Sequence, residues 1–293
     1  MTLKILQFGT TGQLGVELLR RAPGHDVAVT ALGRAEADLA DPEAAAAQVR
    51  AQRPDVVVIA AAYTAVDLAE TEGDLARTVN ALTPGAIAAA AAEVGAATIN
   101  VSTDYVFDGD GGAPYAEDAP TNPLNAYGAT KLEGEKAVTA ANARSLNIRT
   151  SWVVSPHGKN FVKTMLRVAA AGNPLKVVDD QAGRPTSAAD LAGFILDLAP
   201  RLAAAPAGDP LFGTVHFANT GEVTWRDFAV EIFAQALGDA APEVGGQRTA
   251  DYVTPARRPL RATMDLGRLE RVYGVTPRPW QAALADIVAE LKG

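Results

Sequence analysis

A tyrosine and a lysine four positions apart, preceded by a threonine at the end of a predicted strand, have the types and spacing needed for acid–base chemistry. Tyr127 and Lys131 lie at the start of a predicted helix, so they share one of its faces. A phenol with an ordinary pKa of about 10 is a poor acid–base catalyst at neutral pH unless a neighbouring ammonium stabilises the phenolate. Thr103 can hydrogen-bond a substrate carbonyl together with Tyr127. The set predicts carbonyl reduction, with Tyr127 as the proton donor and Lys131 also binding nicotinamide ribose hydroxyls.

Each of these residues also has a purely structural interpretation. Thr103 can cap a strand, Tyr127 can be a core aromatic, and Lys131 can be a surface residue with a packed aliphatic stem. A Tyr-x-x-x-Lys pattern by itself arises by chance in many chains. The functional interpretation therefore depends largely on a second motif near the N-terminus.

That second motif is a glycine-rich turn between the first predicted strand and the first predicted helix. Gly9, Gly12 and Gly15 are spaced three apart and enclose Gln13 and Leu14. Glycines there let the backbone turn sharply and approach a pyrophosphate, which the N–H groups of the helix N-terminus can bind. The turn predicts dinucleotide binding, and a plain strand–helix connection is the alternative.

The end of the second predicted strand bears on the choice of coenzyme. NAD-selective sites usually place an acid there, whereas this strand ends in Leu32-Gly33-Arg34. A guanidinium favours the 2′-phosphate of NADP(H), although Arg34 can equally be an ordinary surface residue. Asp38 can accept from the adenine amino group while Leu39 packs on the ring, and a solvent-facing Asp38 is the alternative.

Strand-like and helix-like segments alternate through the first half of the chain, which predicts βαβ units and a parallel sheet. The expected fold is α/β, a Rossmann-type doubly wound sheet with a smaller C-terminal substrate-binding region. Residues 1–152 are expected to form the dinucleotide-binding domain, and 153–293 mainly the nucleotide-sugar region, with later segments returning to the sheet. The expected strands cover 5–8, 27–32, 56–60, 97–102 and 146–152, and the expected helices 15–21, 42–52, 76–94 and 127–142.

The second half has a looser pattern with recognisable helix starts. Asn160, Ser187 and Thr224 are expected N-caps, and a last helix carries Trp280 and Leu284 on its apolar side. The Pro-, Gly- and Ala-rich segments at 203–208 and 240–246 are expected to be surface connections.

Composition excludes several classes of protein and site. The 293 residues carry a formal net charge of −8, without the basic stripe that nucleic-acid binding needs. There are no cysteines, which excludes disulfides and thiolate sites. No apolar stretch is suited to span a bilayer, so we expect no membrane partner and a cytoplasmic location.

Several segments together resemble the dTDP-4-dehydrorhamnose reductase family of extended short-chain dehydrogenases. They cover nearly the whole chain and comprise 9–15, 60–67, Ser102-Thr103-Asp104-Tyr105-Val106-Phe107, 127–135, Arg149-Thr150-Ser151-Trp152, 158–162, Asp179-Asp180-Gln181-Ala182-Gly183-Arg184-Pro185-Thr186 and 257–259.

The resemblance implies reduction of a dTDP-4-keto-6-deoxy sugar with NADPH or NADH. It implies Tyr127 as proton donor, Lys131 as its activator, and substrate contacts from Thr103, Asp104 and Trp152. It also implies Mg²⁺, a homodimer, and a cofactor cleft lined by Gly12, Gln13, Leu14, Asp38, Leu39, Ala62, Tyr63 and Thr64.

The sugar diphosphate would need positive charge in this acidic protein. Arg184, Arg257 or Arg258 is expected to supply it, and a surface salt bridge is the alternative for each. Two other functions stay open. One is a nucleotide-sugar epimerase or dehydratase that retains its NAD, and the other is a non-catalytic dinucleotide-binding regulatory subunit resembling that of methionine adenosyltransferase.

Overall fold

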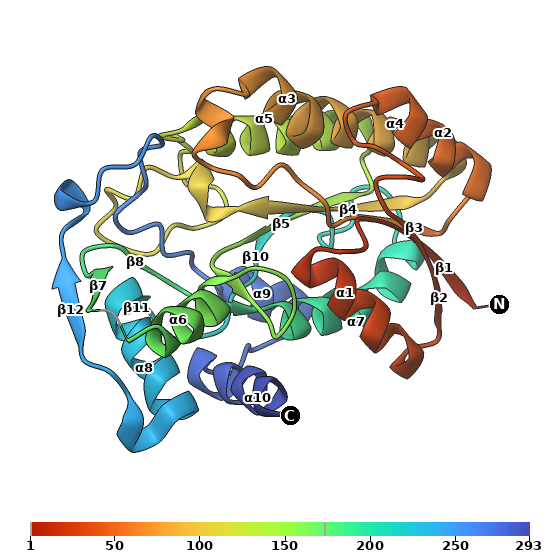
Figure 1. Ribbon diagram of the computed structural model, residues 1–293. Helices are drawn as coiled ribbons and strands as arrows, with labels where there is room; N and C mark the ends of the chain where they lie inside the picture. Colours follow the sequence, from red (N-terminus) through yellow and green to blue (C-terminus); the bar gives the residue numbers. More distant parts are fainter. Residues whose placement is uncertain (1, 173) are drawn as a thin grey trace.

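A parallel six-stranded sheet forms the centre of the protein in a computed structural model that describes residues 2–172 and 174–293 (Figure 1). Its strand order is β10-β5-β4-β3-β1-β2, and every neighbouring pair is parallel. Strand β3 consists of four buried β-branched residues, as expected for a strand covered on both faces. The predicted Rossmann-type α/β fold is confirmed. The strands are β1 Leu3–Phe8, β2 Val27–Leu32, β3 Val56–Ile59, β4 Ala97–Thr103, β5 Ser145–Thr150 and β10 Gly213–His216.

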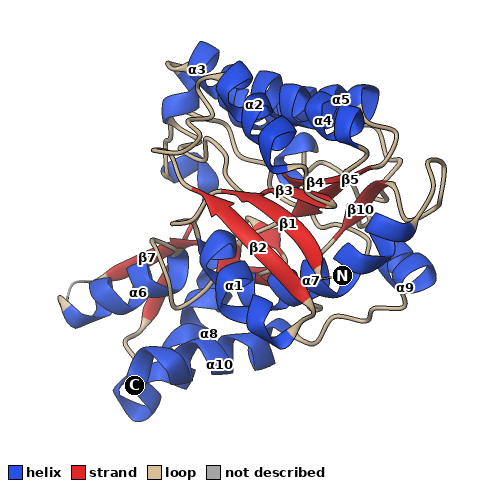
Figure 2. Cartoon of the chain, turned by 90° about the vertical axis from the view of Figure 1, so that its right-hand side faces the viewer, coloured by secondary structure: helices blue, strands red, loops and turns tan. Residues whose placement is uncertain are grey.

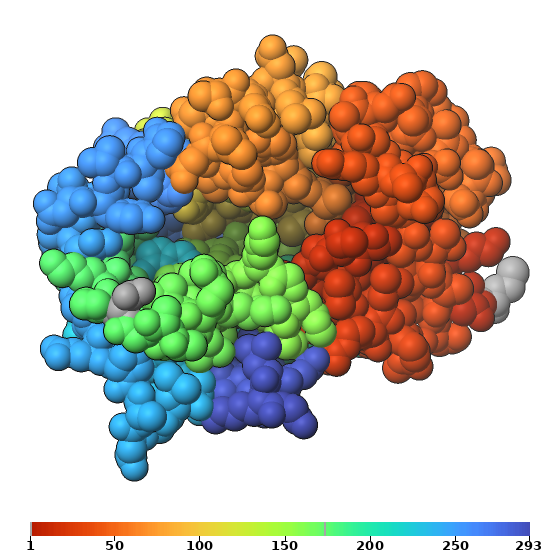
Figure 3. Space-filling view, viewed as in Figure 1, coloured from red at the N-terminus to blue at the C-terminus, as the bar shows by residue number. Residues whose placement is uncertain are grey.

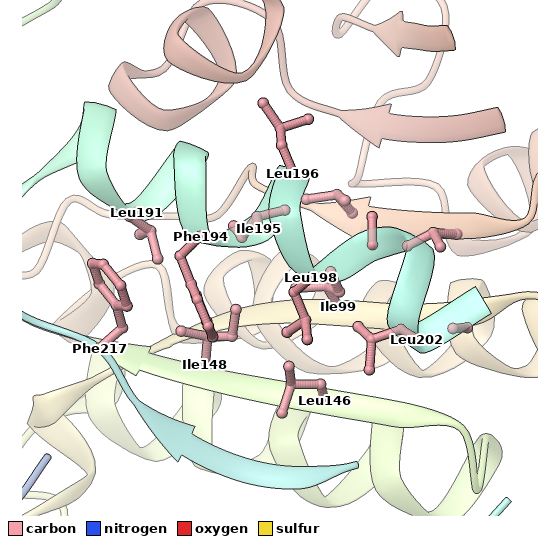
Figure 4. Packing of buried hydrophobic residues seen from close by; sticks show 14 of the residues in the cluster. Ile99, Leu146, Ile148, Leu191, Phe194, Ile195, Leu196, Leu198, Leu202 and Phe217 are labelled. Carbon is pink, nitrogen blue, oxygen red and sulfur yellow. The ribbon is translucent and has the colours of Figure 1, made fainter. Parts of the chain in front are cut away.

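Helices cover both faces of this sheet (Figure 2). The helices of one layer are α2 Pro42–Gln52, α3 Gly73–Arg77, α4 Thr83–Val94 and α5 Ala126–Ala141. Those of the other are α1 Gln13–Arg21, α7 Ala188–Ala204 and α9 Gly267–Tyr273. Figure 4 shows the apolar side chains of α7, among them Leu191, Phe194 and Leu198, packed over Ile148 and Leu146 of β5. Helix α7 and strand β10 come from the second half of the chain, so that half builds part of the central layers.

A smaller region below the sheet has its own apolar core, formed by residues such as Phe228, Ile232, Phe233, Trp280 and Leu284 (Figure 1). Its helices are α6 Phe161–Ala170, α8 Trp225–Leu237 and α10 Trp280–Lys292. Its strands pair two by two: β7 Leu175–Val178 with β12 Val244–Gln247, β8 Ala182–Gly183 with β11 Val223–Thr224, and β6 Val153–Val154 with β9 Thr186–Ser187. None of the helices described is both long and apolar enough to cross a membrane.

The three predicted N-caps are confirmed. The Asn160 side chain accepts from the backbone N–H of Lys163, Ser187 from that of Asp190, and Thr224 from that of Asp227. Each bond satisfies a donor that the first helical turn leaves free.

The structure corrects three predicted boundaries. The helix expected over 76–94 is interrupted by a π-helical turn, Thr78–Leu82, because Pro84 has no N–H to donate to the carbonyl of Asn80. The strand expected to reach Trp152 ends at Thr150, and Trp152 takes a left-handed backbone with φ of 46°. The connection expected at 240–246 contains the start of β12, which pairs with β7 through its backbone despite two glycines.

We predict that Gly134→Ala destabilises the fold by about 1–3 kcal/mol, since the new methyl group would overlap the Asn80 carbonyl where α5 crosses the π-helical turn. Gly193→Ala is the matched control, because its methyl group would meet open space on α7 and raises helix propensity by up to ~1 kcal/mol. Urea titration of both variants measures the free energy of unfolding. Equal stability of the two variants would contradict the close packing of α5.

Candidate active site

A cleft of about 840 Å³ lies at the carboxyl ends of the parallel strands. The segments that follow β1, β2, β3, β4 and β5 all contribute to its lining. Figure 3 shows the surface hollowed between the red and orange N-terminal part of the chain and its green middle part. Open α/β sheets bind ligands at this edge, where successive connections leave the sheet in opposite directions.

The glycine-rich turn forms one end of the cleft. Gly9 has φ of 102°, and a Cβ on it would lie 2.8 Å from the Cβ of Ala61. A Cβ on Gly15 would overlap the Gly9 carbonyl oxygen. The Gln7 amide holds the turn closed by donating to the carbonyls of Gly9 and Gly15 at 2.7 and 3.0 Å. Gly12 is the N-cap of α1, so the first backbone N–H groups of that helix face this end of the cleft, as anion binding requires.

Gln13 lines the cleft as predicted and also braces it. Its amide nitrogen donates to the carbonyl of Val153 at 2.9 Å, and its oxygen accepts from Ser155 and Asn160 at 2.9 and 3.0 Å. These bonds join the glycine-rich turn to the segment after β6, which brings Lys159 into the lining. Lys159 had no predicted role, because only the fold brings it beside the turn.

The residues after β2 lie where the adenosine half of a dinucleotide was expected. Arg34, Asp38 and Leu39 all line the cleft. The Arg34 side chain is 88% exposed and lies 3.9 Å from Asp38. Glu36 accepts from the backbone N–H of Gly33 at 2.9 Å, so its carboxylate is occupied within its own loop.

Two of the three residues predicted after β3, Ala62 and Thr64, also line the cleft. Tyr63 is not among the lining residues. Its hydroxyl donates to Glu72 at 2.6 Å, and its backbone N–H donates to Asn80 at 2.9 Å. The hydrogen bond to Glu72 holds the Tyr63 side chain outside the lining.

Thr103, Tyr127 and Lys131 converge in the middle of the cleft. Asn125 caps α5 by accepting from Gly128 at 2.8 Å, which puts Tyr127 in the first turn and Lys131 one turn later. The ring of Tyr105 meets that of Tyr127 edge-on, with 5.7 Å between centroids. Thr103, Tyr127 and Lys131, which the spacing in the sequence grouped, therefore also lie together in the structure.

Burial controls the protonation of these groups. It raises the pKa of Tyr127 to about 12, against the opposing effect of a hydrogen bond with Thr103, and so keeps the phenol protonated at neutral pH. It lowers the pKa of Lys131 to about 8, and the negative charge of Glu135 limits that fall. It also raises the pKa of Asp104 to about 7, against a hydrogen bond from Thr103 at 3.1 Å. A proton donor, a cation and a titrating acid thus lie together in the cleft.

The opposite wall of the cleft is aromatic. Trp152 and Trp225 both line it, and their rings stack with centroids 3.5 Å apart and planes 9° apart. A Cβ on Gly183 would lie 2.8 Å from the Trp152 indole, so glycine is needed there for the ring to fit. Trp152 was predicted to contact the substrate, whereas Trp225, the first residue of α8, was not predicted to lie in the cleft.

The arginines expected to hold a diphosphate do not line the cleft. Arg184 is half-buried, and its Nε has no hydrogen-bond partner among the described residues. Burial lowers its pKa, and the charges of Glu222 and Asp265 oppose that effect. Arg258 pairs with Asp67 at 2.9 Å, and Arg257 is exposed. Lys159 lines the cleft instead of these arginines, together with Arg34 and Lys131.

A metal site was expected only from the resemblance. Within 2–172 and 174–293, no three His, Asp or Glu side chains gather closely enough to hold a metal ion. The expected Mg²⁺ thus has no such ligand cluster among the described residues.

Comparisons with known proteins agree on one family. The family model described as RmlD substrate binding domain matches residues 3–292. A relative from Burkholderia thailandensis named dTDP-4-dehydrorhamnose reductase is 42% identical over 99% of each chain. A crystal structure of a dTDP-4-dehydrorhamnose reductase from Clostridium acetobutylicum is 38% identical, with a TM-score of 0.92 over 99% of this chain and 100% of that one. A Bacillus anthracis dTDP-4-dehydrorhamnose reductase in complex with NADP is 33% identical, with the same TM-score and coverage.

We predict that Gly15→Ala weakens dinucleotide affinity at least about tenfold, because the methyl group would push the turn away from the pyrophosphate. Gly24→Ala is the control, since its methyl group would meet open space away from the cleft. Titration of NADPH fluorescence measures both affinities, and circular dichroism checks folding. Equal affinities in two folded variants would refute the assigned role of the turn.

Proposed function

Because the chain belongs to the dTDP-4-dehydrorhamnose reductase family, we propose that it reduces the 4-keto group of dTDP-4-dehydrorhamnose to dTDP-L-rhamnose, using NADPH or NADH. The observation that carries the proposal is the convergence of Thr103, Tyr127 and Lys131 in the cleft that begins at the glycine-rich turn. The cleft suits a dinucleotide, since the turn is packed too tightly for a side chain on Gly9 or Gly15 and the first N–H groups of α1 face the cleft.

A reduced nicotinamide, when bound, supplies the hydride for the sugar C4. Tyr127 donates its phenolic proton to the carbonyl oxygen, so the C=O bond becomes an alcohol and the phenol becomes a phenolate. Lys131 stabilises that phenolate, since with a pKa of about 8 it is mostly charged at neutral pH. Thr103 polarises the carbonyl through its hydroxyl. Its single hydroxyl proton is donated to Asp104 at 3.1 Å, so this proton must turn from that carboxylate to the carbonyl oxygen when the substrate binds.

The substrate is proposed to lie between these groups and the aromatic wall. Trp152 offers an apolar face to the sugar ring, and Asp104, 4% exposed, offers a buried carboxyl to a sugar hydroxyl. Lys159 replaces Arg184 in this proposal as the cation nearest a phosphate, because Lys159 lines the cleft and Arg184 does not.

The assembly and location belong to the same proposal. We propose a homodimer in the cytoplasm, where reduced coenzyme and nucleotide sugars are found. Light scattering at several protein concentrations tests the dimer, and a monomer mass throughout would refute it.

Two rival functions make different predictions. An epimerase or dehydratase of this fold places a further acid beside the strand-end threonine, whereas Tyr105 follows Asp104 here. Such an enzyme retains NAD through purification and consumes no added coenzyme. A regulatory subunit binds the dinucleotide but turns over nothing, and a complete Thr103, Tyr127 and Lys131 set argues against it.

Mixing the purified protein with dTDP-4-keto-6-deoxy-L-hexose and NADPH should consume the coenzyme, as measured by loss of absorbance at the reduced-nicotinamide band. Tyr127→Phe is the matched variant. It should bind NADPH unchanged and lose about 10²–10⁴-fold in turnover, as expected for loss of a general acid. Absence of turnover with both NADPH and NADH would refute the reductase function. An undiminished rate in Tyr127→Phe would remove that residue from its role.

We predict that Arg34→Ala lowers kcat/KM with NADPH up to about tenfold and leaves the value with NADH unchanged, because only NADPH carries the 2′-phosphate. The effect is kept modest by the high exposure of Arg34. Arg167→Ala, on the exposed side of α6, is the control. Steady-state kinetics with both coenzymes measures the ratio, and equal losses would show that Arg34 does not recognise the phosphate.

A further inference from the structure

An ion pair between Glu135 and Arg149 lies buried directly behind the active site. The two side chains are 5% and 6% exposed. Arg149 donates to both carboxylate oxygens, from Nε at 2.9 Å and from a terminal nitrogen at 2.7 Å. Ser102 donates to the same carboxylate at 2.5 Å. Removing two charges from water costs several kcal/mol per ion, so a pair at this depth calls for a reason beyond stability.

The pair connects α5 and β4, which carry the proposed catalytic residues, with the neighbouring strand β5. Glu135 is on α5, one turn after Lys131 and two turns after Tyr127, on the same helix face. Ser102 is on β4 and immediately precedes Thr103. Arg149 is on β5, opposite Ser102 in the sheet register. One carboxylate thus ties the helix that carries the proton donor to the strand that carries Thr103.

The far side of Arg149 is also fully engaged. It donates to the Glu117 carbonyl at 3.1 Å, lies 5.1 Å from the centre of the Phe107 ring, and is 3.5 Å from Nε2 of His216. Nδ1 of His216 donates to the Asp265 carbonyl at 3.0 Å, so Nε2 is the acceptor. Burial, followed by the charge of Arg149, lowers the pKa of His216 to about 3, and His216 is neutral here. The guanidinium therefore has little freedom to leave Glu135.

Lys131 itself is 2% exposed and is left out of this pairing. Among the described residues, no carboxylate lies within 4.0 Å of its ammonium. The charge that acts on it is that of Glu135 on its own helix, whose carboxylate is paired with Arg149 on β5. Asp104 after β4 and the phenols of Tyr127 and Tyr105 line the same cleft as Lys131. Arg149 hydrogen-bonds both carboxylate oxygens of Glu135. The Lys131 ammonium therefore stays available to a ligand in the cleft, while the negative charge of Glu135 still attracts it.

We propose that Glu135 and Arg149 are positioning residues that fix α5 against β4 and β5 and set the charge state of Lys131 from behind. The role in turnover rests on the proposed reductase function, whereas the charge state of Lys131 does not.

The proposal predicts opposite effects for the two single substitutions. Glu135→Gln keeps the shape and a hydrogen-bonding group but removes the negative charge and leaves Arg149 unpaired. The pKa of Lys131 should then fall by about one pH unit. Arg149→Met removes the competing cation and leaves the carboxylate to Lys131, so the pKa of Lys131 should rise. The double variant should return close to the wild-type value, because it removes both charges together.

The test is an NMR titration of lysine labelled with ¹³C at Cε, which reports the Lys131 midpoint with or without turnover. Lys131→Arg assigns the signal. Ser102→Ala is the control, since it removes one hydrogen bond to Glu135 but no charge. The alkaline limb of kcat/KM should follow the NMR midpoint in each variant that turns over.

Unchanged midpoints in folded Glu135→Gln and Arg149→Met, or shifts in the same direction, would overturn the proposal. Where Arg149→Met does not fold, Arg149→Lys keeps the charge and should leave the midpoint near wild type while lowering kcat through looser positioning. If the wild-type protein showed no turnover while the midpoints of its variants shifted as predicted, the charge effect would be upheld and the reductase function would be refuted.

Discussion

Burial of an ammonium is the constraint on which the active site depends. In the proposed mechanism Lys131 must be charged to stabilise the phenolate of Tyr127, yet it is 2% exposed, and burial disfavours that charge. The same burial keeps Tyr127 protonated and raises the pKa of Asp104. A cleft that excludes water strengthens every electrostatic contact with a substrate, but only if Lys131 keeps its positive charge there. The negative charge of Glu135, one helical turn behind, opposes the loss of that cation.

Close backbone packing makes this burial possible. Helix α5 approaches the π-helical turn so closely that Gly134 cannot carry a side chain, and its first turn meets the Tyr105 carbonyl in the same way at Gly128. Gly128 thus brings α5 onto the segment that follows β4, and Gly134 brings it against the neighbouring π-helical turn. Glycine is about 1 kcal/mol less favourable than alanine in a helix, so the close approach of α5 costs local helix stability at these two positions.

The sequence predicted what local chemistry determines. Strand Val27–Leu32, helix Pro42–Gln52 and the caps at Asn160, Ser187 and Thr224 match, because periodicity and capping are properties of short segments. The convergence of Thr103, Tyr127 and Lys131 was predictable because parallel strands end at one edge. The positions of Arg184, Lys159 and Trp225 relative to the cleft were not predictable, since each depends on how distant segments pack. The pairing of Glu135 with Arg149 depends on the sheet register in the same way.

Strand β5 links the two walls of the cleft. Arg149 pairs with Glu135 on the helix that carries Tyr127, and three residues later Trp152 begins the aromatic wall. Trp152 leaves the strand with a left-handed backbone that costs about 1 kcal/mol or more, and its carbonyl accepts from the Thr186 N–H at 3.2 Å. Ser151 donates to the Arg184 carbonyl at 2.7 Å, so the smaller region holds this turn from outside. Because one short segment carries both Arg149 and Trp152, a shift in its register would change the separation between Trp152 and Tyr127. The strained turn at Trp152 fixes that separation.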